Sequence, residues 1–269
     1  MFLVTGGTGT LGRLVVPQLL QAGGKVRVLS RRDHEPAEGI EYVTGDLDTG
    51  AGIDAAVAGA EVVVHCAGAQ KGDGDKARTL VRAASRVEGL DGAAAPHLVN
   101  ISVTGADRVP QESRLDRTMF GYFGSKLEAE QVIAASGLPW TTLRATQFYD
   151  LLLMVARAMA RLPVIPVASG MRFQPVDAGE VAVRLAELAQ GPPSGLVPDL
   201  AGPRVYPMAD LIQSYLRAVG KRRPVVPVRL PGRAARAVRD GANLAPGSAV
   251  NGAAGRRTWE EFLAERVGR

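Results

Sequence analysis

The sequence predicts an α/β fold in which helices cover both faces of a doubly wound parallel sheet. Short apolar runs alternate with segments of helical periodicity at regular intervals along the chain. Some of these runs, such as Val-Val-Val-His-Cys at 62–66, are almost continuously apolar, as expected of strands that are covered on both faces. The two observations together are typical of consecutive strand–helix–strand units that build a parallel sheet.

Six strands and the helices between them follow from these patterns. In the first helix, Leu11, Val15 and Leu19 recur at helical spacing. Pro17 lies inside this helix and is expected to bend it or to remove a hydrogen bond. Strands are predicted at 2–4, 25–30, 41–45, 61–68, 97–102 and 140–144, and further helices around 51–58, 74–88, 121–136 and 148–161.

The pattern changes after residue 162. Prolines become frequent, the alternation fades, and helices are predicted at 177–190, 207–219 and 258–266. The last of these begins at Thr258 with Glu261 three residues later, which is the spacing of a capping box. We therefore divide the chain into a main domain, 1–162, and a small, mainly helical C-terminal region, 163–269, within the same globular unit.

Length and composition fit one soluble domain. The 269 residues are enough for a sizeable core, and 46% hydrophobic against 22% charged residues is ordinary for a globular protein. Cys66 is the one cysteine, so no intrachain disulfide can form. With no visible N-terminal signal and no apolar run near the roughly 20 residues that span a bilayer, the sequence predicts a cytoplasmic protein without membrane contact.

The formal charge of +5 is concentrated in one C-terminal stretch. Such a cluster either binds an anionic partner or nucleic acid, or forms a solvated face. No helix-turn-helix pattern, zinc-ligand spacing or stacking aromatics accompany it, so we favour the solvated face and expect no nucleic acid partner. We also expect no metal site, because the three histidines do not cluster. The basic residues concerned are Arg217, Lys221, Arg222, Arg223, Arg229, Arg233, Arg236 and Arg239.

A glycine-rich turn follows the first strand and opens the first helix. Gly6, Gly9 and Gly12 stand where one glycine permits the tight turn, another lets backbone approach a pyrophosphate, and a third allows close packing of helix on strand. The helix N-terminus then presents its N–H groups to the phosphates. The main domain is therefore predicted to be a dinucleotide-binding Rossmann domain, with contacts from Thr5, Gly6, Gly7, Thr8, Gly9, Thr10, Leu11 and Gly12.

The end of the second strand bears on which dinucleotide is bound. In an NAD-selective fold an acidic residue near this point holds the ribose 2′-hydroxyl. Here Ser30, Arg31 and Arg32 occupy it, and a guanidinium can grip a 2′-phosphate with forked, charge-assisted hydrogen bonds. This predicts a preference for NADP(H), although an exposed basic turn is the plainer interpretation. Asp33 comes next and keeps NAD(H) as an alternative.

Two further strand ends are predicted to contact the adenosine half. Asp46 and Leu47 follow the third strand, where the aspartate can accept from the adenine amino group or, more plainly, cap the next helix. Ala67 and Gly68 close the fourth strand, and their small size would let the adenine ribose lie close to the backbone.

These segments carry a resemblance to a known family. VTGGTGTLG, GDL, HCAGA, YFGSK and SGLPWTTLRATQFYD together resemble an atypical short-chain dehydrogenase/reductase of the NmrA-like, NAD(P)H-binding group. The resemblance covers roughly the first 150 residues, and FQPVDAGEVA at 173–182 is similar to the start of that group's substrate-side region. Beyond that the similarity is loose.

The resemblance implies a catalytic pair. In catalytic members of the wider superfamily a Tyr-x-x-x-Lys pair transfers the proton, and this chain has Tyr122 and Lys126. The lysine would lower the pKa of the tyrosine and hold the nicotinamide ribose, and the phenol would protonate a carbonyl as hydride arrives. Ser102, or Thr104, would bind the substrate oxygen, unless either makes ordinary strand-end hydrogen bonds. The chain departs from the typical reductases in having no asparagine on the helix after the fourth strand.

The segment after the sixth strand is predicted to border the substrate. Thr146 could bond the nicotinamide carboxamide, and Gln147, Phe148 and Tyr149 would line the cleft at the carboxyl edge of the sheet. Apolar walls from Met154, Phe173 and Trp259 are a weaker expectation, since such residues are more often core.

Three functions remain open on the sequence. The leading one is an NADPH-dependent oxidoreductase that acts on a small or medium carbonyl or quinone-like compound, with the C-terminal region shaping specificity. The second is a non-catalytic NADP(H)-binding redox sensor that acts through a protein partner, which the missing asparagine favours. The third is an isomerase or epimerase with tightly bound NAD, which Arg31 and Arg32 disfavour. A homo-oligomer is compatible with all three.

Overall fold

A computed structural model describes residues 1–35, 37–69, 71–87, 94–247 and 255–267. The chain forms two compact units, and each is built from separate stretches of sequence. The first unit comprises Met1–Ser102, Ser125–Leu143 and Gly179–Val197, and the second comprises Val103–Gly124, Arg144–Ala178 and Pro198–Arg269. The sequence boundary after residue 162 therefore does not coincide with the boundaries of these units.

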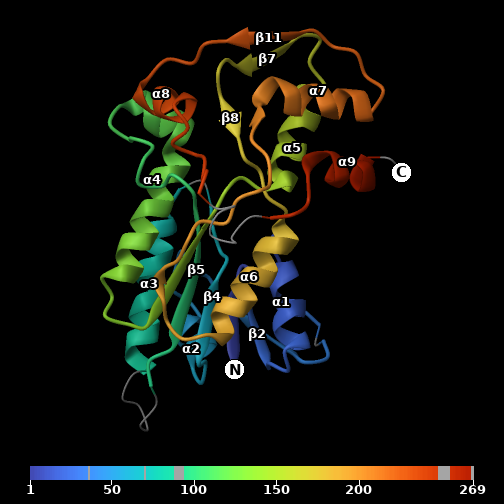
Figure 1. The fold of residues 1–269 in the computed structure, drawn as a ribbon. Coiled ribbons are helices and arrows are strands. Elements are labelled where there is room, and N and C mark those ends of the chain that lie inside the picture. Colours follow the sequence, from blue (N-terminus) through green and yellow to red (C-terminus); the bar gives the residue numbers. More distant parts are fainter. Residues whose placement is uncertain (36, 70, 88–93, 248–254, 268–269) are drawn as a thin grey trace. The chain divides into compact units, whose positions relative to one another are not determined.

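The first unit contains a seven-stranded sheet in the order β3-β2-β1-β4-β5-β6-β9 (Figure 1). Val4 of β1 pairs in parallel with Val28 of β2 on one side and with Val64 of β4 on the other. The predicted α/β fold class is confirmed. The strands are β1 (Phe2–Thr5), β2 (Val26–Ser30), β3 (Ile40–Thr44), β4 (Val62–His65), β5 (His97–Val103), β6 (Trp140–Ala145) and β9 (Gly195–Leu196).

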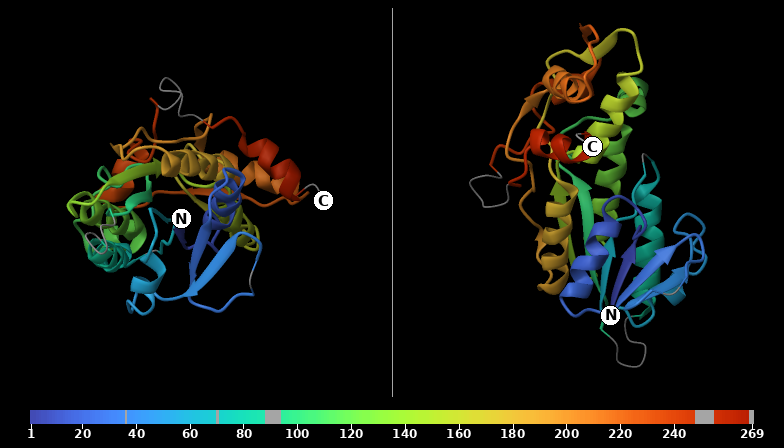
Figure 2. Two further views of the ribbon diagram at one scale, coloured as in Figure 1. Left: turned by 90° about the horizontal axis from the view of Figure 1, so that it is seen from below. Right: turned by 90° about the vertical axis from the view of Figure 1, so that its right-hand side faces the viewer.

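Helices cover both faces of this sheet (Figures 1 and 2). On one face lie α1 (Gly12–Gln21) and α6 (Ala178–Gln190), and α1 continues through Pro17. On the other lie α2 (Ile53–Val57), α3 (Asp73–Val87) and the later part of α4 (Arg114–Ala134). The sequence placed 177–190 in the C-terminal region, whereas α6 and β9 belong to the unit that holds the sheet.

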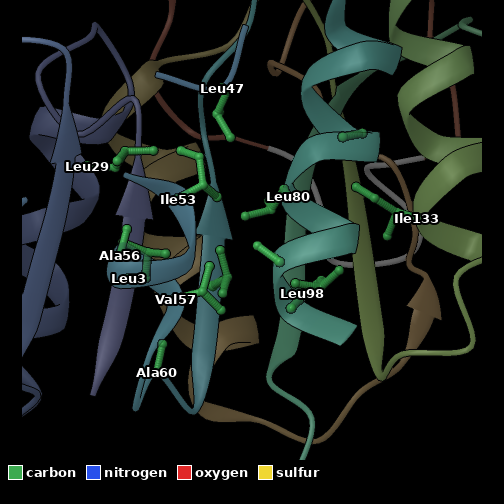
Figure 3. Packing of buried hydrophobic residues seen from close by; sticks show 14 of the residues in the cluster. Leu3, Leu29, Leu47, Ile53, Ala56, Val57, Ala60, Leu80, Leu98 and Ile133 are labelled. Carbon is green, nitrogen blue, oxygen red and sulfur yellow. The ribbon is translucent and has the colours of Figure 1, made fainter. Parts of the chain in front are cut away.

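The core beneath α2 and α3 is aliphatic, as the low aromatic content requires. Leu3 and Leu98 project from the sheet, and they pack against side chains from the helices. These are Ile53 of α2, Leu80 of α3 and Ile133 of α4, and all five residues are almost completely buried (Figure 3). Burying an aliphatic side chain contributes about 1.5–3 kcal/mol, so this layer holds the strand ends in place. The site residues described below project from those ends.

The second unit is not purely helical. It contains α5 (Tyr149–Met159), α7 (Met208–Ala218), α8 (Arg233–Arg239) and α9 (Trp259–Val267). It also contains two small sheets that the sequence did not predict, because their strands are very short or rich in proline. One pairs β7 (Ile165–Ala168) with β11 (Val225–Val228) in parallel, and the other pairs β8 (Arg172–Phe173) with β10 (Tyr206–Pro207) antiparallel.

Two helix starts show how capping sets the elements. At α9 the predicted capping box is confirmed, since Glu261 accepts from the Thr258 N–H at 2.8 Å and the Thr258 Oγ1 accepts from the Glu261 N–H at 3.3 Å. The start of α4 lies seven residues before the predicted 121. The Ser113 Oγ accepts from the Asp116 N–H at 3.0 Å, and an Asp116 carboxylate oxygen accepts from the Ser113 N–H at 3.2 Å, which is a capping exchange that we missed.

The described ranges hold neither a membrane-spanning helix nor a cluster of metal-ligating side chains. Among the helices of residues 1–35, 37–69, 71–87, 94–247 and 255–267, none is both long and apolar enough to cross a membrane. In the same residues no three potential metal-ligating side chains of His, Cys, Asp or Glu gather as a metal site would require.

Candidate functional site

The glycine turn is closed by backbone contacts that leave no room for a side chain. Gly6 has a φ of +68°, and a Cβ on it would lie 2.7 Å from the Ala67 nitrogen. A Cβ on Gly12 would lie 2.2 Å from the Gly6 oxygen, and one on Gly7 would lie 2.7 Å from Cγ1 of Val28. The three glycines therefore serve the turn itself, the packing of α1 on the turn, and the packing of the turn on β2.

The start of α1 is suited to an anion. The Gly9 N–H donates to the Gly6 oxygen at 2.9 Å and closes the turn just before the helix. The N-cap residue Leu11 makes no side-chain capping bond, and the first helical turn holds no acidic residue. The positive end of the helix dipole is therefore left without a negative side chain, as a pyrophosphate site requires.

At the end of β2 the basic side chains are exposed, whereas the acidic one is hydrogen-bonded to β3. Ser30 is buried, and its Oγ accepts from the Arg32 N–H at 3.1 Å and lies 2.8 Å from Nε2 of His34. Arg31 and Arg32 are exposed, and in the part of the chain that the structure describes neither forms an ion pair. Asp33 instead accepts a hydrogen bond from the Thr44 hydroxyl of β3. The two guanidinium groups are thus the groups at this strand end that are available to an anion.

The two adenosine-side predictions stay predictions. One carboxylate oxygen of Asp46 accepts from the Asp48 N–H at 2.9 Å, so that side chain stabilises the turn after β3, while Leu47 is buried in the core. Ala67 is half-buried against Gly6, and Gly68 is exposed.

Two titratable groups at the end of β4 are held neutral. The His65 Nδ1 lies 2.8 Å from the Thr5 Oγ1, and burial, followed by the nearby Lys126 ammonium, lowers the pKa of His65 to about 4. Burial also raises the pKa of the Cys66 thiol to about 12. Neither group titrates near neutral pH. His65 is a buried packing residue, as predicted, and the Cys66 thiol is half-buried.

Lys126 is a buried cation in the first unit. Its Nζ lies 3.0 Å from Oδ2 of Asp73 and 3.5 Å from the Ile101 carbonyl oxygen. The exposed fraction is 7% for the lysine side chain and 1% for the aspartate, so water screens this pair poorly. A Cβ on Gly68 would lie 2.7 Å from the same Nζ. The ammonium therefore lies against the segment that follows β4, which also packs on the glycine turn.

Asp73, which pairs with Lys126, was not predicted from the sequence. It is the first residue of α3, the helix that follows β4. Its Oδ1 accepts from the Ala69 N–H at 2.8 Å, and its own N–H donates to the Ser125 Oγ at 3.1 Å. An aspartate at a helix start is an ordinary cap in sequence, and its partner is 53 positions away, so no local pattern marks it.

The remaining residues of the predicted catalytic set lie on β5, after it, and on α4. Ser102 and Thr104 are buried, and within the described residues the Ser102 hydroxyl has no hydrogen-bond partner. Tyr122 is a residue of α4, four positions before Lys126, and is 40% exposed. The roles assigned to these residues stay predictions.

Of the residues that follow β6 in the second unit, some are core and one lines a cavity. Tyr149 is fully buried, and its hydroxyl donates to the Arg257 carbonyl oxygen at 2.6 Å, so it is a core residue and does not border a cleft. Thr146 is buried and donates to the Gln174 carbonyl oxygen at 2.5 Å, and Phe148 is the N-cap of α5. Gln147 lines an apolar cavity of about 200 Å³.

With this geometry established, comparison with known proteins gives the family. The family model for NAD(P)H binding matches residues 6–151, which is more than half of the chain. The chain belongs to the NAD(P)H-binding family. The predicted cofactor class is thereby confirmed, and the matched span runs from the glycine turn to the start of α5.

Three similar proteins extend the comparison. The chain is 29% identical to the ceramide reductase of Caulobacter vibrioides, over 85% of this chain and 74% of the relative. It is 28% identical to the (4-alkanoyl-5-oxo-2,5-dihydrofuran-3-yl)methyl phosphate reductase of Streptomyces griseus subsp. griseus, over 82% and 74%. A solved NADPH-dependent quinone oxidoreductase of Escherichia coli, complexed with NADPH, aligns over 99% of both chains with a TM-score of 0.78 at 19% identity. This last likeness is one of fold.

The close contact at Gly12 gives a first prediction. Gly12→Ala places a methyl group 2.2 Å from the Gly6 oxygen, so the turn must open or α1 must shift. We expect the affinity for NADPH to fall about tenfold or more, since overpacking costs about 1–3 kcal/mol. Fluorescence titration with NADPH measures it. Gly191→Ala is the control, because a Cβ there meets nothing closer than 3.6 Å, and an equal loss in both variants would contradict the assignment.

The buried ion pair gives a second prediction. Asp73→Asn keeps the shape of the side chain but leaves the Lys126 ammonium buried opposite a neutral amide. Breaking a buried pair from one side costs about 3–5 kcal/mol, which urea denaturation at neutral pH would detect as a lower free energy of unfolding. The control is Asp75→Asn on the same helix, where the carboxylate is 80% exposed and pairs with Arg78, and where a loss below about 1 kcal/mol is expected. Equal losses would show that the Asp73 pair contributes no more than a surface pair.

Proposed function

We propose that the chain is an NADPH-dependent oxidoreductase of the short-chain dehydrogenase/reductase type that reduces a small or medium carbonyl or quinone-like compound. The observation that carries this proposal is the position of Lys126. Its ammonium is buried, is held by Asp73 at 3.0 Å, and lies against Gly68 in the segment that packs on the glycine turn. A lysine held at that place is suited to bind the nicotinamide ribose hydroxyls beside the reacting ring.

In this proposal three side chains act on the substrate oxygen and the cofactor. The bound cofactor supplies the hydride that forms the new C–H bond at the carbonyl carbon. Tyr122 donates its phenolic proton to the carbonyl oxygen, so that the carbonyl becomes an alcohol. Lys126 favours the phenolate that remains, and the Ser102 hydroxyl, which has no partner among the described residues, donates to the same oxygen.

The exposure of Tyr122 offers a route for its proton that does not need the missing asparagine. Typical reductases of the superfamily use an asparagine to support a water that relays a proton to the tyrosine. Here Tyr122 is 40% exposed, so its phenolate can regain a proton from bulk water directly. The helix that lacks the asparagine is α3. It begins at Asp73, whose carboxylate contacts Lys126. The missing asparagine therefore no longer favours the sensor over the enzyme.

The preference for NADPH rests on the end of β2. Arg31 and Arg32 are exposed there, while the carboxylate of Asp33 accepts from Thr44 and is turned to β3. A 2′-phosphate would gain forked, charge-assisted bonds from the guanidinium groups. The names of the relatives agree with reduction, since both are reductases, and the structural relative was solved with NADPH.

Cofactor preference gives a third prediction. The double variant Arg31→Ala/Arg32→Ala should weaken NADPH binding about tenfold to a hundredfold, because hydrogen bonds to a charged group are worth about 1.5–3 kcal/mol. NADH has no 2′-phosphate, so its dissociation constant should change by less than about threefold. Titrations with both cofactors measure this, and Lys25→Ala, at the opposite end of β2, should alter neither. Equal losses of affinity for NADPH and NADH would show that Arg31 and Arg32 do not bind the 2′-phosphate.

Turnover gives a fourth prediction. Tyr122→Phe should lower kcat for NADPH oxidation by about 10²–10⁴ and leave NADPH binding unchanged, because general acid catalysis contributes that factor. A screen of ketones, aldehydes and quinones identifies the substrate. Tyr215→Phe, in the core of the second unit, is the control and should keep its rate. Undiminished turnover in Tyr122→Phe would exclude Tyr122 as the acid, and tight NADPH binding without turnover on any carbonyl would favour the redox sensor.

A further inference from the structure

The second unit contains an apolar cavity that the proposed reaction does not by itself use. Its volume is about 200 Å³, and its walls come from α5, α7, the start of α9 and Phe173 of β8. Aliphatic, aromatic and thioether side chains form these walls, and Gln147 is the exception. Leu151 also lines the cavity and is 45% exposed, so the cavity is accessible from solvent at that side chain.

The cavity arises from the sizes and orientations of two side chains. Ala156 on α5 is 1% exposed and carries only a methyl group, although it faces large neighbours. Trp259 turns its indole N–H away to the Ser214 Oγ, at 2.8 Å, and so presents carbon to the cavity. Protein interiors are close-packed and contain few voids larger than a water molecule. An apolar space several times that size, open to solvent on one side, is therefore a candidate ligand site.

Gln147 supplies a polar group on this wall. Its Oε1 is buried and, within the described ranges, accepts no hydrogen bond. The backbone at this position is fixed, because the Val176 N–H donates to the Gln147 carbonyl oxygen at 3.0 Å. A buried acceptor without a donor is costly, and a ligand that brings an O–H or N–H would remove that cost.

We propose that this cavity binds the apolar tail of a ligand that carries a hydroxyl or amide N–H at the base of the tail. A dry cavity of about 150 Å³ accommodates benzene, and one water occupies about 30 Å³. By that measure the cavity holds a ring or a chain of roughly six or seven carbons. The inference rests on the proposed function in one respect, which is that the ligand is the substrate of the reductase.

Chain length is the quantity that tests the cavity. The probes are primary alcohols from butanol to decanol, titrated by calorimetry into the intact chain with saturating NADPH. Affinity should rise about fourfold for each added methylene group until the cavity is full, and then level off. Methyl ethers of equal length lack the donor and should bind more weakly, and Gln147→Leu should abolish that difference.

Filling the cavity supplies the matched variants. Ala156→Leu places three more carbons inside it and should remove the dependence on chain length, while NADPH binding stays at the wild-type value. Ala158→Leu, two residues along the same helix and exposed, should bind the alcohols as wild type does. If Ala156→Leu fails to fold, Leu151→Trp at the exposed edge of the cavity tests the same point.

The outcomes separate the cavity from the reaction. Affinities that do not change with chain length, or that are the same in Ala156→Leu, overturn the inference. Binding that depends on chain length and is lost in Ala156→Leu supports it, even if no carbonyl is reduced, in which case the proposed reductase fails alone. Reduction of carbonyls at a rate independent of both chain length and Ala156→Leu overturns the cavity as the substrate site and leaves the reductase intact.

Discussion

The close approach of backbone at the ends of β1 and β4 is the constraint on which the cofactor site depends. Gly6 packs on the Ala67 nitrogen, and Gly12 packs on the Gly6 oxygen, at distances that exclude a Cβ. This contact sets the start of α1, and so the direction in which its N–H groups point. It also brings the segment after β4 next to the turn, and the Lys126 ammonium lies on that same segment at Gly68. One packing constraint thus shapes both the glycine turn and the surroundings of the buried cation.

The buried pair explains how a cation is kept at this position. A buried cation is costly unless it is paired, and the Asp73 carboxylate lies 3.0 Å from the Lys126 Nζ. Asp73 is itself held by the Ala69 N–H at 2.8 Å. The same charge acts on His65, whose pKa falls to about 4 through burial and then through Lys126. The histidine beside the buried ion pair is therefore neutral near neutral pH and adds no charge to the site.

Much of the fold and the cofactor class could be predicted, because their physical causes are local. A glycine turn between a strand and a helix is a requirement on consecutive residues, and Thr258 with Glu261 caps α9 as their spacing indicates. The partner of Lys126 could not be predicted, since Asp73 is distant in sequence. Tyr149 was placed at a cleft from its position after a strand, but packing against Trp259 and Phe262 makes it core. Burial of that kind depends on the tertiary fold.

The glycine turn and the cavity of the second unit differ in how far the sequence reveals them. In a glycine-rich turn of this kind backbone groups are the ones suited to phosphates. Backbone can approach a phosphate only where side chains are absent, so glycine marks the position in the sequence. The cavity of the second unit is created by the small volume of Ala156 among larger side chains and by the orientation of Trp259. Alanine in a helix is the commonest of residues and marks nothing by itself. A ligand that fits there is therefore specified by volume and by one buried amide, Gln147, which only the folded unit brings to the same wall.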